Sequence, residues 1–304
     1  MSEGEQSVAR FSAVQVYVHF LMAAAILVLL LTGVAITFGG HVGWIVGLIG
    51  STNVVLVHVV AGVTLFVSLL YYVIYILTGI PTGTVPTAWV PTAGTVREVI
   101  AYAKSVLGMG PRPRPGKYTW IQKSEMLIIS AELTLLTATG LLLTFPGLLL
   151  RYKPWFLAVS DVHAVLAFTL LIGVTYHLYD RHVEDFPLDE SMFTGRVSME
   201  KAREEWAGWV DAEPIETGEN EPIEVAGVLI VLFVFAVLYS GILLDRVLAP
   251  IPGTSTTLFL TERPTAIIEG SFGLFWGVGL NLVVLIILAG LIALFYGLGR
   301  RFAE

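Results

Sequence analysis

Residues 157–179 read LAVSDVHAVLAFTLLIGVTYHLY, an apolar run with one acidic residue, Asp161, and two histidines, His163 and His177. A hydrocarbon core roughly 30 Å thick needs about 20 apolar residues in a helix. Lipid offers no partners for backbone N–H and C=O groups, so a run of this length predicts a membrane-spanning helix. Ionisable side chains inside a membrane are costly, and the two histidines therefore mark this helix for a function.

Five more stretches are long and apolar enough to span a membrane: residues 12–38, 53–79, 120–146, 223–247 and 272–297. The whole chain is 56% apolar and 13% charged, with a mean hydropathy of +0.80. Arg10 and Arg97 enclose a segment without a single charged residue. The sequence therefore predicts an all-α integral membrane protein with six spans. A cleaved signal peptide is the alternative for the first stretch, but its length and the single preceding cation, Arg10, favour a retained helix.

The basic residues predict how the six spans are oriented. Thirteen of the 17 lysines and arginines fall on the side that holds both termini, and four fall on the other side. The positive-inside rule then places both termini in the cytoplasm of a multi-pass cell-membrane protein. The net charge of −7 is local, since residues 180–222 contain thirteen acidic and four basic residues. A solvated loop is the simpler interpretation, and a docking surface for a basic partner is the alternative.

An internal repeat with an offset of 107 residues relates the first four spans. Its paired elements are Arg10-Phe11-x-x-x-Gln15 with Lys117-Tyr118-x-x-x-Gln122, and Thr32-Gly33 with Thr139-Gly140. Each copy opens with a cation and an aromatic residue of the kind that anchors helices at membrane interfaces. The repeat predicts two related hairpins in one four-helix bundle, which would occupy residues 1–210. An acidic cytoplasmic linker at 211–222 and a two-helix extension at 223–304 would follow.

Four histidines lie within predicted spans, and their depths match in pairs. His163 and His177 are separated by about 40° around the helix and roughly 21 Å along it, so they face the same way in opposite leaflets. By depth, His19 meets only His177, and His58 meets only His163. The chain has no cysteine, which excludes iron–sulfur clusters and c-type haem attachment in this chain.

Two such pairs are the ligand set that two stacked bis-histidine haems require. The histidines would then bind haem iron as the metal ligands of a four-helix dihaem bundle with two additional C-terminal helices. An isolated buried histidine is more often a hydrogen-bonded core residue, but the matched depths favour haem. His41 and His182 fall outside the spans and are interpreted as solvated.

These residues resemble the cytochrome b (gamma) subunit of membrane-bound formate dehydrogenases and the related cytochrome b of nickel–iron hydrogenases. The resemblance covers about residues 8–210. It is carried by Arg10-Phe11 leading to Gln15 and His19, by Gly116-Lys117-Tyr118-x-x-x-Gln122-Lys123, by His163-x13-His177, by the 39 residues from His19 to His58, and by Val197-Ser198 through Ala202-Arg203 to Trp206.

The resemblance implies an outer b haem on His58 and His163 and an inner b haem on His19 and His177. It also implies a quinone site beside the inner haem, formed by Tyr118, Thr119, Gln122 and His177, with menaquinone or ubiquinone as substrate. Electrons would come from an iron–sulfur subunit that serves a catalytic dehydrogenase or reductase subunit.

This sequence departs from the family in two respects. The quinone-site motif of the family usually reads Tyr-Asn-x-Gly-Gln, whereas here it reads Tyr118-Thr119-Trp120-Ile121-Gln122, with a hydroxyl in place of the amide. The last two spans of this sequence have no counterpart in the four-helix members, so the set of partners is open. The substrate of the catalytic subunit and the direction of electron flow are open as well.

Two carboxylates lie seven residues apart in the third span. Because a charge at this depth is costly, Glu125 and Glu132 are candidates for a function. One hypothesis is a proton relay from the cytoplasm to the quinone, and another is a hydrogen bond from Glu132 to a haem-ligand imidazole. A protonated glutamate bonded between helices is the simpler alternative.

Two helices outside the spans are expected at the membrane surface. Val96, Val99, Ile100, Ala103 and Leu107 share one helical face. A second helix would begin at Ser198 as N-cap, with Met199, Ala202, Trp206 and Trp209 facing the bilayer or a partner.

Two other functions compete with the dihaem subunit. The cytochrome b of a quinol–cytochrome c complex needs a second helix with paired histidines, but Tyr72 stands fourteen residues after His58. A transporter with histidines along a polar path would suit the repeat, although it gives no reason for matched depths. Nothing in the sequence points to a nucleic-acid partner.

Overall fold

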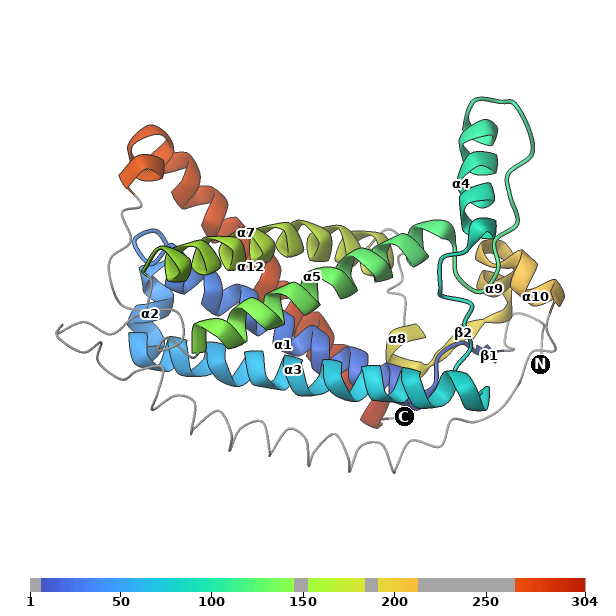
Figure 1. The fold of residues 1–304 in the computed structure, drawn as a ribbon, viewed down its shortest axis with the longest axis horizontal. Helices are drawn as coiled ribbons and strands as arrows, with labels where there is room; N and C mark the ends of the chain where they lie inside the picture. Colours follow the sequence, from blue (N-terminus) through green and yellow to red (C-terminus); the bar gives the residue numbers. More distant parts are fainter. Residues whose placement is uncertain (1–6, 145–152, 184–190, 213–265, 304) are drawn as a thin grey trace.

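The computed structural model describes residues 7–144, 153–183, 191–212 and 266–303. In these ranges the protein is an all-α membrane bundle with one small sheet (Figure 1). Five of the described helices are long and apolar enough to cross a membrane. The predicted span at 223–247, the acidic segment from 213 onward and the start of the predicted C-terminal extension lie outside the described residues.

The five long helices agree with the predicted spans to within a few residues at most ends. They are α1 (Ala13–Thr37), α3 (Ser51–Thr82), α5 (Trp120–Thr144), α7 (Lys153–Leu178) and α12 (Ala266–Ala303). The helix α12 runs well past the predicted 272–297, and α3 continues through Pro81 to a left-handed cap at Gly83, whose φ is 74°. Glycine adopts that conformation without steric cost, which ends the helix there.

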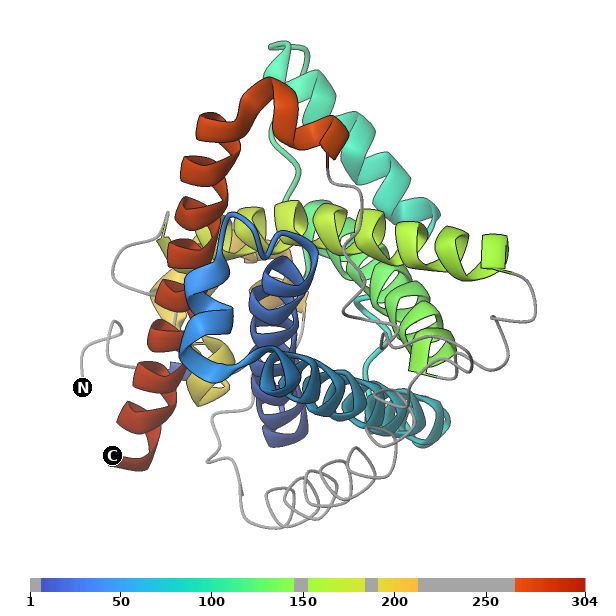
Figure 2. The same cartoon turned by 90° about the vertical axis from the view of Figure 1, so that its left-hand side faces the viewer.

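The bundle is built from two hairpins, α1 with α3 and α5 with α7, and α12 packs against α1 (Figure 2). Leucines from four different helices meet in its central core, including Leu30, Leu65, Leu133 and Leu170. Ile287 of α12 joins the same core. The described part of the C-terminal extension is therefore continuous with the four-helix bundle.

A short helix that the sequence did not predict, α2 (Gly43–Ile49), turns the chain from α1 into α3. It lies at the end of the bundle opposite α4, as Figure 1 shows. Gly50 with φ 82° makes the turn into α3. At this end Trp44 donates its indole N–H to Asn281 of α12 at 2.8 Å. Because α2 is the link inside the first hairpin, this end is the outer side of the predicted topology.

The inner end carries the predicted helix α4 (Ala93–Val106), which projects across the direction of the spanning helices (Figure 1). Thr92 caps it, since the Thr92 hydroxyl accepts a hydrogen bond from Gly94 N–H. Val96, Ile100 and Leu107 are exposed, as expected for an apolar face directed at a membrane surface.

A two-stranded antiparallel sheet joins the chain's beginning to the segment after α7. Strand β1 (Ser7–Ala9) pairs with β2 (Arg196–Ser198), and α8 (Ser191–Thr194) precedes β2. The Arg196 guanidinium donates to the Ser7 hydroxyl and carbonyl at 2.8 and 2.9 Å. The sheet lies at the same end as α4 and therefore closes the inner side of the bundle.

The helix expected from Ser198 is present, but its predicted orientation is wrong. Ser198 caps α9 (Met199–Glu205), and α10 (Ala207–Ala212) follows. Ala202, Trp206 and Trp209 are buried with Val8 of the sheet, and Met199 packs on them. The apolar face covers the sheet because β1 supplies an apolar partner within the chain. The Arg10 guanidinium lies 3.2 Å from the centroid of the Trp206 ring and completes this layer.

Candidate functional site

The structure brings the four spanning histidines together in two pairs. His19 of α1 and His177 of α7 have ring centroids 6.1 Å apart, with 49° between the ring planes. His58 of α3 and His163 of α7 have centroids 6.5 Å apart, with 73° between the planes. The first pair lies near the inner end and the second toward the outer end. Helix α7 supplies one ring of each pair.

These distances fit two imidazoles on opposite sides of one metal ion. With metal–nitrogen bonds of about 2 Å, the ring centroids of such a pair stand roughly 6 Å apart. Within the described part of the chain, no group of three or more His, Cys, Asp or Glu side chains is arranged to hold a metal ion. Two imidazoles from opposite sides, with apolar helices around them, are the donor set of a bis-histidine haem.

The family model for prokaryotic cytochrome b561 matches residues 10–195. The match spans well over half of the chain and includes all four paired histidines. The chain belongs to this family. It is accordingly a membrane cytochrome b that takes part in electron transfer, and haem b is its cofactor. No curated protein matches the sequence.

In this cytochrome, each histidine of the outer pair is hydrogen bonded within its own hairpin. The Thr32 hydroxyl oxygen lies 2.8 Å from Nδ1 of His58, and the Thr139 hydroxyl oxygen lies 2.8 Å from Nδ1 of His163. These threonines belong to the repeated Thr-Gly pair. The pair is recognisable in the sequence as part of the repeat, but its contact with the imidazoles was not predicted.

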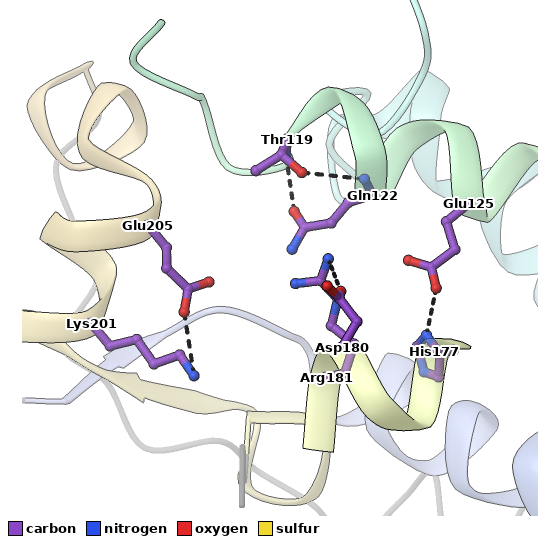
Figure 3. Close-up of polar contacts among 8 residues, drawn as sticks. All are labelled: Thr119, Gln122, Glu125, His177, Asp180, Arg181, Lys201 and Glu205. Atoms are coloured by element: carbon purple, nitrogen blue, oxygen red, sulfur yellow. Dashed lines mark hydrogen bonds and ion pairs between the residues drawn. The ribbon is translucent and has the colours of Figure 1, made fainter. Parts of the chain in front are cut away.

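At the inner pair, a carboxylate takes the corresponding place. Nδ1 of His177 lies 2.9 Å from Oε1 of Glu125, which projects from α5 toward the end of α7 (Figure 3). A carboxylate that is hydrogen bonded to the non-ligating nitrogen of an imidazole fixes the tautomer of the ring and raises the strength of the imidazole as a metal ligand. The position equivalent to Glu125 in the first repeat copy is Val18, so only the second hairpin carries this group.

The hydrogen bond to an imidazole that we considered for Glu132 is made by Glu125 instead. Glu132 lies two helical turns further along α5, where neither the inner nor the outer histidine of α7 is level with it. Within the described ranges, Glu132 has no hydrogen bond or ion pair and is partly exposed. Depth explains the difference, since Glu125 is near the inner end of α5, as His177 is near the inner end of α7.

Thr119 and Gln122 form a capping box at the start of α5. Gln122 N–H donates to the Thr119 hydroxyl at 3.2 Å, and Thr119 N–H donates to the Gln122 carbonyl oxygen at 2.9 Å (Figure 3). The first repeat copy does the same with Ser12 and Gln15 at the start of α1. The Asn-to-Thr departure thus preserves the N-cap, because both residue types serve there.

Tyr118 lies beneath this cap and is 5% exposed. Burial raises the pKa of its hydroxyl, while nearby Arg10 and a hydrogen bond with Gln15 lower it by less. The Tyr118 ring packs against Phe11, with centroids 6.5 Å apart. The first residues of the two repeat copies therefore meet at the inner end, beside the layer formed by Arg10 and Trp206.

A π-helical turn, η2 (Tyr179–Val183), directly follows α7 and begins two residues after His177. Such turns are uncommon and are concentrated at functional sites. The Asp180 carboxylate and the Arg181 guanidinium form an ion pair at 2.7 Å. Figure 3 shows this pair opposite Gln122 of α5. Charged and amide groups therefore surround the inner end of α7, next to the inner histidine pair.

The other two histidines are separate from the pairs. His41 lies in the outer turn between α1 and α2, where its carbonyl accepts a hydrogen bond from Asn281 at 3.3 Å. His182 is part of η2, and its side chain lies outside the described residues. Tyr72, which occupies the position that a second histidine pair on α3 would need, stacks on Tyr75 with centroids 6.1 Å apart.

Proposed function

We propose that this cytochrome is the membrane-anchoring dihaem subunit of a respiratory oxidoreductase complex. It transfers electrons between an iron–sulfur or catalytic partner subunit and the quinone pool. The observation that carries the proposal is the presence of two facing imidazole pairs near opposite ends of one spanning bundle, with ring centroids 6.1 and 6.5 Å apart. A single histidine pair would place a haem in one leaflet only, whereas two pairs would place a haem in each leaflet and allow electron transfer across the membrane.

In this proposal His58 and His163 hold the outer haem, and His19 and His177 hold the inner haem. Each haem b, when bound, supplies one-electron transfer. The protein orients His58, His163 and His177 through hydrogen bonds at Nδ1, and it surrounds the pairs with leucine-rich helix packing that excludes water. The haem-binding domain is residues 1–210, residues 211–222 link it to the extension, and 223–304 form the extension, whose described part packs on α1.

The quinone site is proposed at the inner end, on Tyr118, Thr119, Gln122 and His177. Support comes from the bond to His177 of Glu125, which lies one turn along α5 from Gln122, at the meeting of α5 and α7 (Figure 3). The capping box uses the side-chain carbonyl oxygen of Gln122. The side-chain N–H groups of Gln122 can therefore donate to a quinone oxygen. Glu125 is the carboxylate through which a proton relay from the inner surface would run, with Glu132 two turns deeper.

The membrane is proposed to be the cell membrane, with the inner end in the cytoplasm. Support comes from the basic residues at that end. Arg10 lies over the Trp206 ring, Arg114 forms an ion pair with Asp211 of α10, Lys117 lies over the Trp209 ring, and Arg181 belongs to η2. The iron–sulfur partner then exchanges electrons with the cytochrome at the outer end, near α2. Quinone reaches the inner end from the lipid.

Haem counting tests the proposal. Pyridine haemochrome analysis of the purified cytochrome should give two b haems per chain. His58→Ala and His177→Ala should each remove one haem, and redox titration should show that the two variants lose different ones. His41→Ala is the matched control and should retain both. One haem in the wild type, or two in either paired-histidine variant, would overturn the assignment.

A further inference from the structure

The two threonines of the repeated Thr-Gly pair are placed alike. Thr32 is buried in α1, and Thr139 is partly buried in α5. Each hydroxyl oxygen is 2.8 Å from Nδ1 of the histidine on the partner helix of its own hairpin. The separations along the chain differ, at 26 residues for Thr32–His58 and 24 for Thr139–His163. The bundle geometry therefore makes the same contact twice despite different connecting segments.

We assign the direction of both bonds from the second acceptor, a helical carbonyl, that lies beside each hydroxyl. The Thr32 hydroxyl lies 2.7 Å from the Val28 carbonyl, and the Thr139 hydroxyl lies 2.8 Å from the Leu135 carbonyl. A hydroxyl has one hydrogen, and a carbonyl can only accept. Donation to the carbonyl, a common arrangement for threonine in a helix, leaves each hydroxyl oxygen to accept from the imidazole N–H.

In this assignment both outer imidazoles carry their proton on Nδ1. In a neutral imidazole this leaves the lone pair on Nε2, the nitrogen that faces away from the threonine. The two rings are thus set in the tautomer that can bind iron through Nε2. Their planes are also held at 73° to each other, whereas those of the inner pair are at 49°.

The glycines of the pair complete the contact. A Cβ atom built on Gly33 would lie 3.5 Å from Cε1 of His58, and one built on Gly140 would lie 3.4 Å from Cε1 of His163. Cε1 is the ring carbon between Nδ1 and Nε2. In each Thr-Gly pair, the threonine hydroxyl is hydrogen bonded to Nδ1, and the glycine backbone packs against the ring edge at Cε1. A methyl group would fit there in ordinary contact, but a branched side chain would extend over the ring.

We propose that Thr32 and Thr139 are positioning residues for the outer haem, which fix the tautomer and the rotation of its two histidine ligands. The inference rests on the proposed binding of haem by His58 and His163. These threonines also make the ligands of the outer haem chemically different from the ligand His177 of the inner haem. Both outer ligands donate to neutral hydroxyls, whereas the inner ligand His177 is bonded to the Glu125 carboxylate, a stronger acceptor.

The test uses valine, which matches threonine in shape and lacks the hydroxyl. Thr32→Val and Thr139→Val remove the hydroxyl that accepts from the imidazole Nδ1–H, and loss of such a partner typically weakens metal binding by about 10- to 100-fold. A tenfold weaker preference for ferric over ferrous iron raises the midpoint potential by about 59 mV. We expect the outer haem alone to shift upward or to be lost.

Electron paramagnetic resonance gives a readout that stability alone does not change. The signal of ferric low-spin haem depends on the angle between the two axial imidazole planes. Near-perpendicular planes give a more anisotropic signal than nearly parallel ones. With ring planes at 73°, the outer haem should give the more anisotropic of the two wild-type signals. Each valine variant should change that signal and leave the inner haem's signal unchanged.

Serine and a second threonine provide the controls. Thr32→Ser and Thr139→Ser keep the hydroxyl and should restore the wild-type signal and midpoint. Thr134 makes the same backbone hydrogen bond, to Ser130 at 2.7 Å, on the exposed side of α5, and Thr134→Val should change neither haem. A wild-type signal and midpoint in both valine variants would overturn the inference, as would equal defects in valine and serine variants. A wild type without two haems would instead overturn the proposed function.

Discussion

Replacing Glu125 by glutamine should raise the midpoint potential of the inner haem. The Glu125 carboxylate is 2.9 Å from Nδ1 of His177, and the two side chains are 14% and 29% exposed. Glutamine keeps the shape and still presents an oxygen, but it removes the charge. The carboxylate strengthens the imidazole as a ligand and so favours ferric iron, which is the more positive state. Its removal favours the reduced state.

The magnitude follows from the change in the hydrogen bond. A bond to a charged group contributes about 1.5–3 kcal/mol, and a neutral bond about 0.5–1.5 kcal/mol. The difference of roughly 1.4 kcal/mol, if it acts on the ferric state, is a factor of about ten in the redox equilibrium. For a one-electron couple this factor corresponds to an upward shift of about 59 mV.

Optical redox titration of the purified protein measures the shift. The His58→Ala background, which lacks the outer haem under the proposed assignment, isolates the inner one. Glu132→Gln is the matched control, because Glu132 is a glutamate on the same helix with no such bond to His177. The reasoning is refuted by an unchanged midpoint in Glu125→Gln, or by an equal shift in Glu132→Gln.

Three further predictions concern the inner end. Trp206→Ala should destabilise the layer under Arg10 by about 3–5 kcal/mol, because the indole is fully buried, and limited proteolysis should then cut residues 191–212 faster than in Trp206→Phe. Thr119→Ala should lower the thermal unfolding temperature through loss of a cap worth about 1 kcal/mol, while Thr119→Asn keeps it. Burial raises the pKa of Tyr118, so its contribution to stability is complete below the ordinary value of 10.0 and is lost as the pH rises through the raised value. Tyr118→Phe should reduce this alkaline loss when unfolding is followed from about pH 9 to pH 11.

The long helices were predictable because lipid imposes a length and an apolar composition on every span. The same constraint made the histidine pairs visible in the sequence, since a helix running straight through a membrane converts residue number into depth. His163 and His177 could therefore be placed in opposite leaflets by counting. Outside the membrane, residue number does not give the position of a segment in this way.

The sheet and the layer beneath it were not predictable for that reason. Strands β1 and β2 have three residues each and lie almost 190 residues apart, too short for an alternating pattern to be recognised. Their pairing reversed the expected orientation of Trp206, which is buried under Arg10 and does not face lipid. Without a partner strand in view, an amphipathic segment near a membrane is interpreted as a surface helix.

The hydrogen-bond partners of the imidazoles were less predictable than the long helices and more predictable than the sheet. Thr32 and Thr139 carried a signal, because the repeat preserved them, and counting residues from the outer ends would have placed them near His58 and His163. Glu132 was considered as an imidazole partner because it lies deep in the membrane, where a charge costs most. The contact belongs to Glu125 since a hydrogen bond requires equal depth on facing helices, and depth alone does not decide which residue faces which.

Helix α7 contributes one imidazole to each pair, and this has a consequence for biogenesis. As the ribosome delivers the chain, His19 and His58 emerge first, on neighbouring helices whose imidazoles face no partner of the same depth. Neither pair exists until α7 has entered the bilayer, and then both are completed by the same insertion event. A cytochrome that binds haem through these pairs would acquire both cofactors late in synthesis, and arrest of translation before α7 would leave a membrane-embedded fragment unable to take up either one.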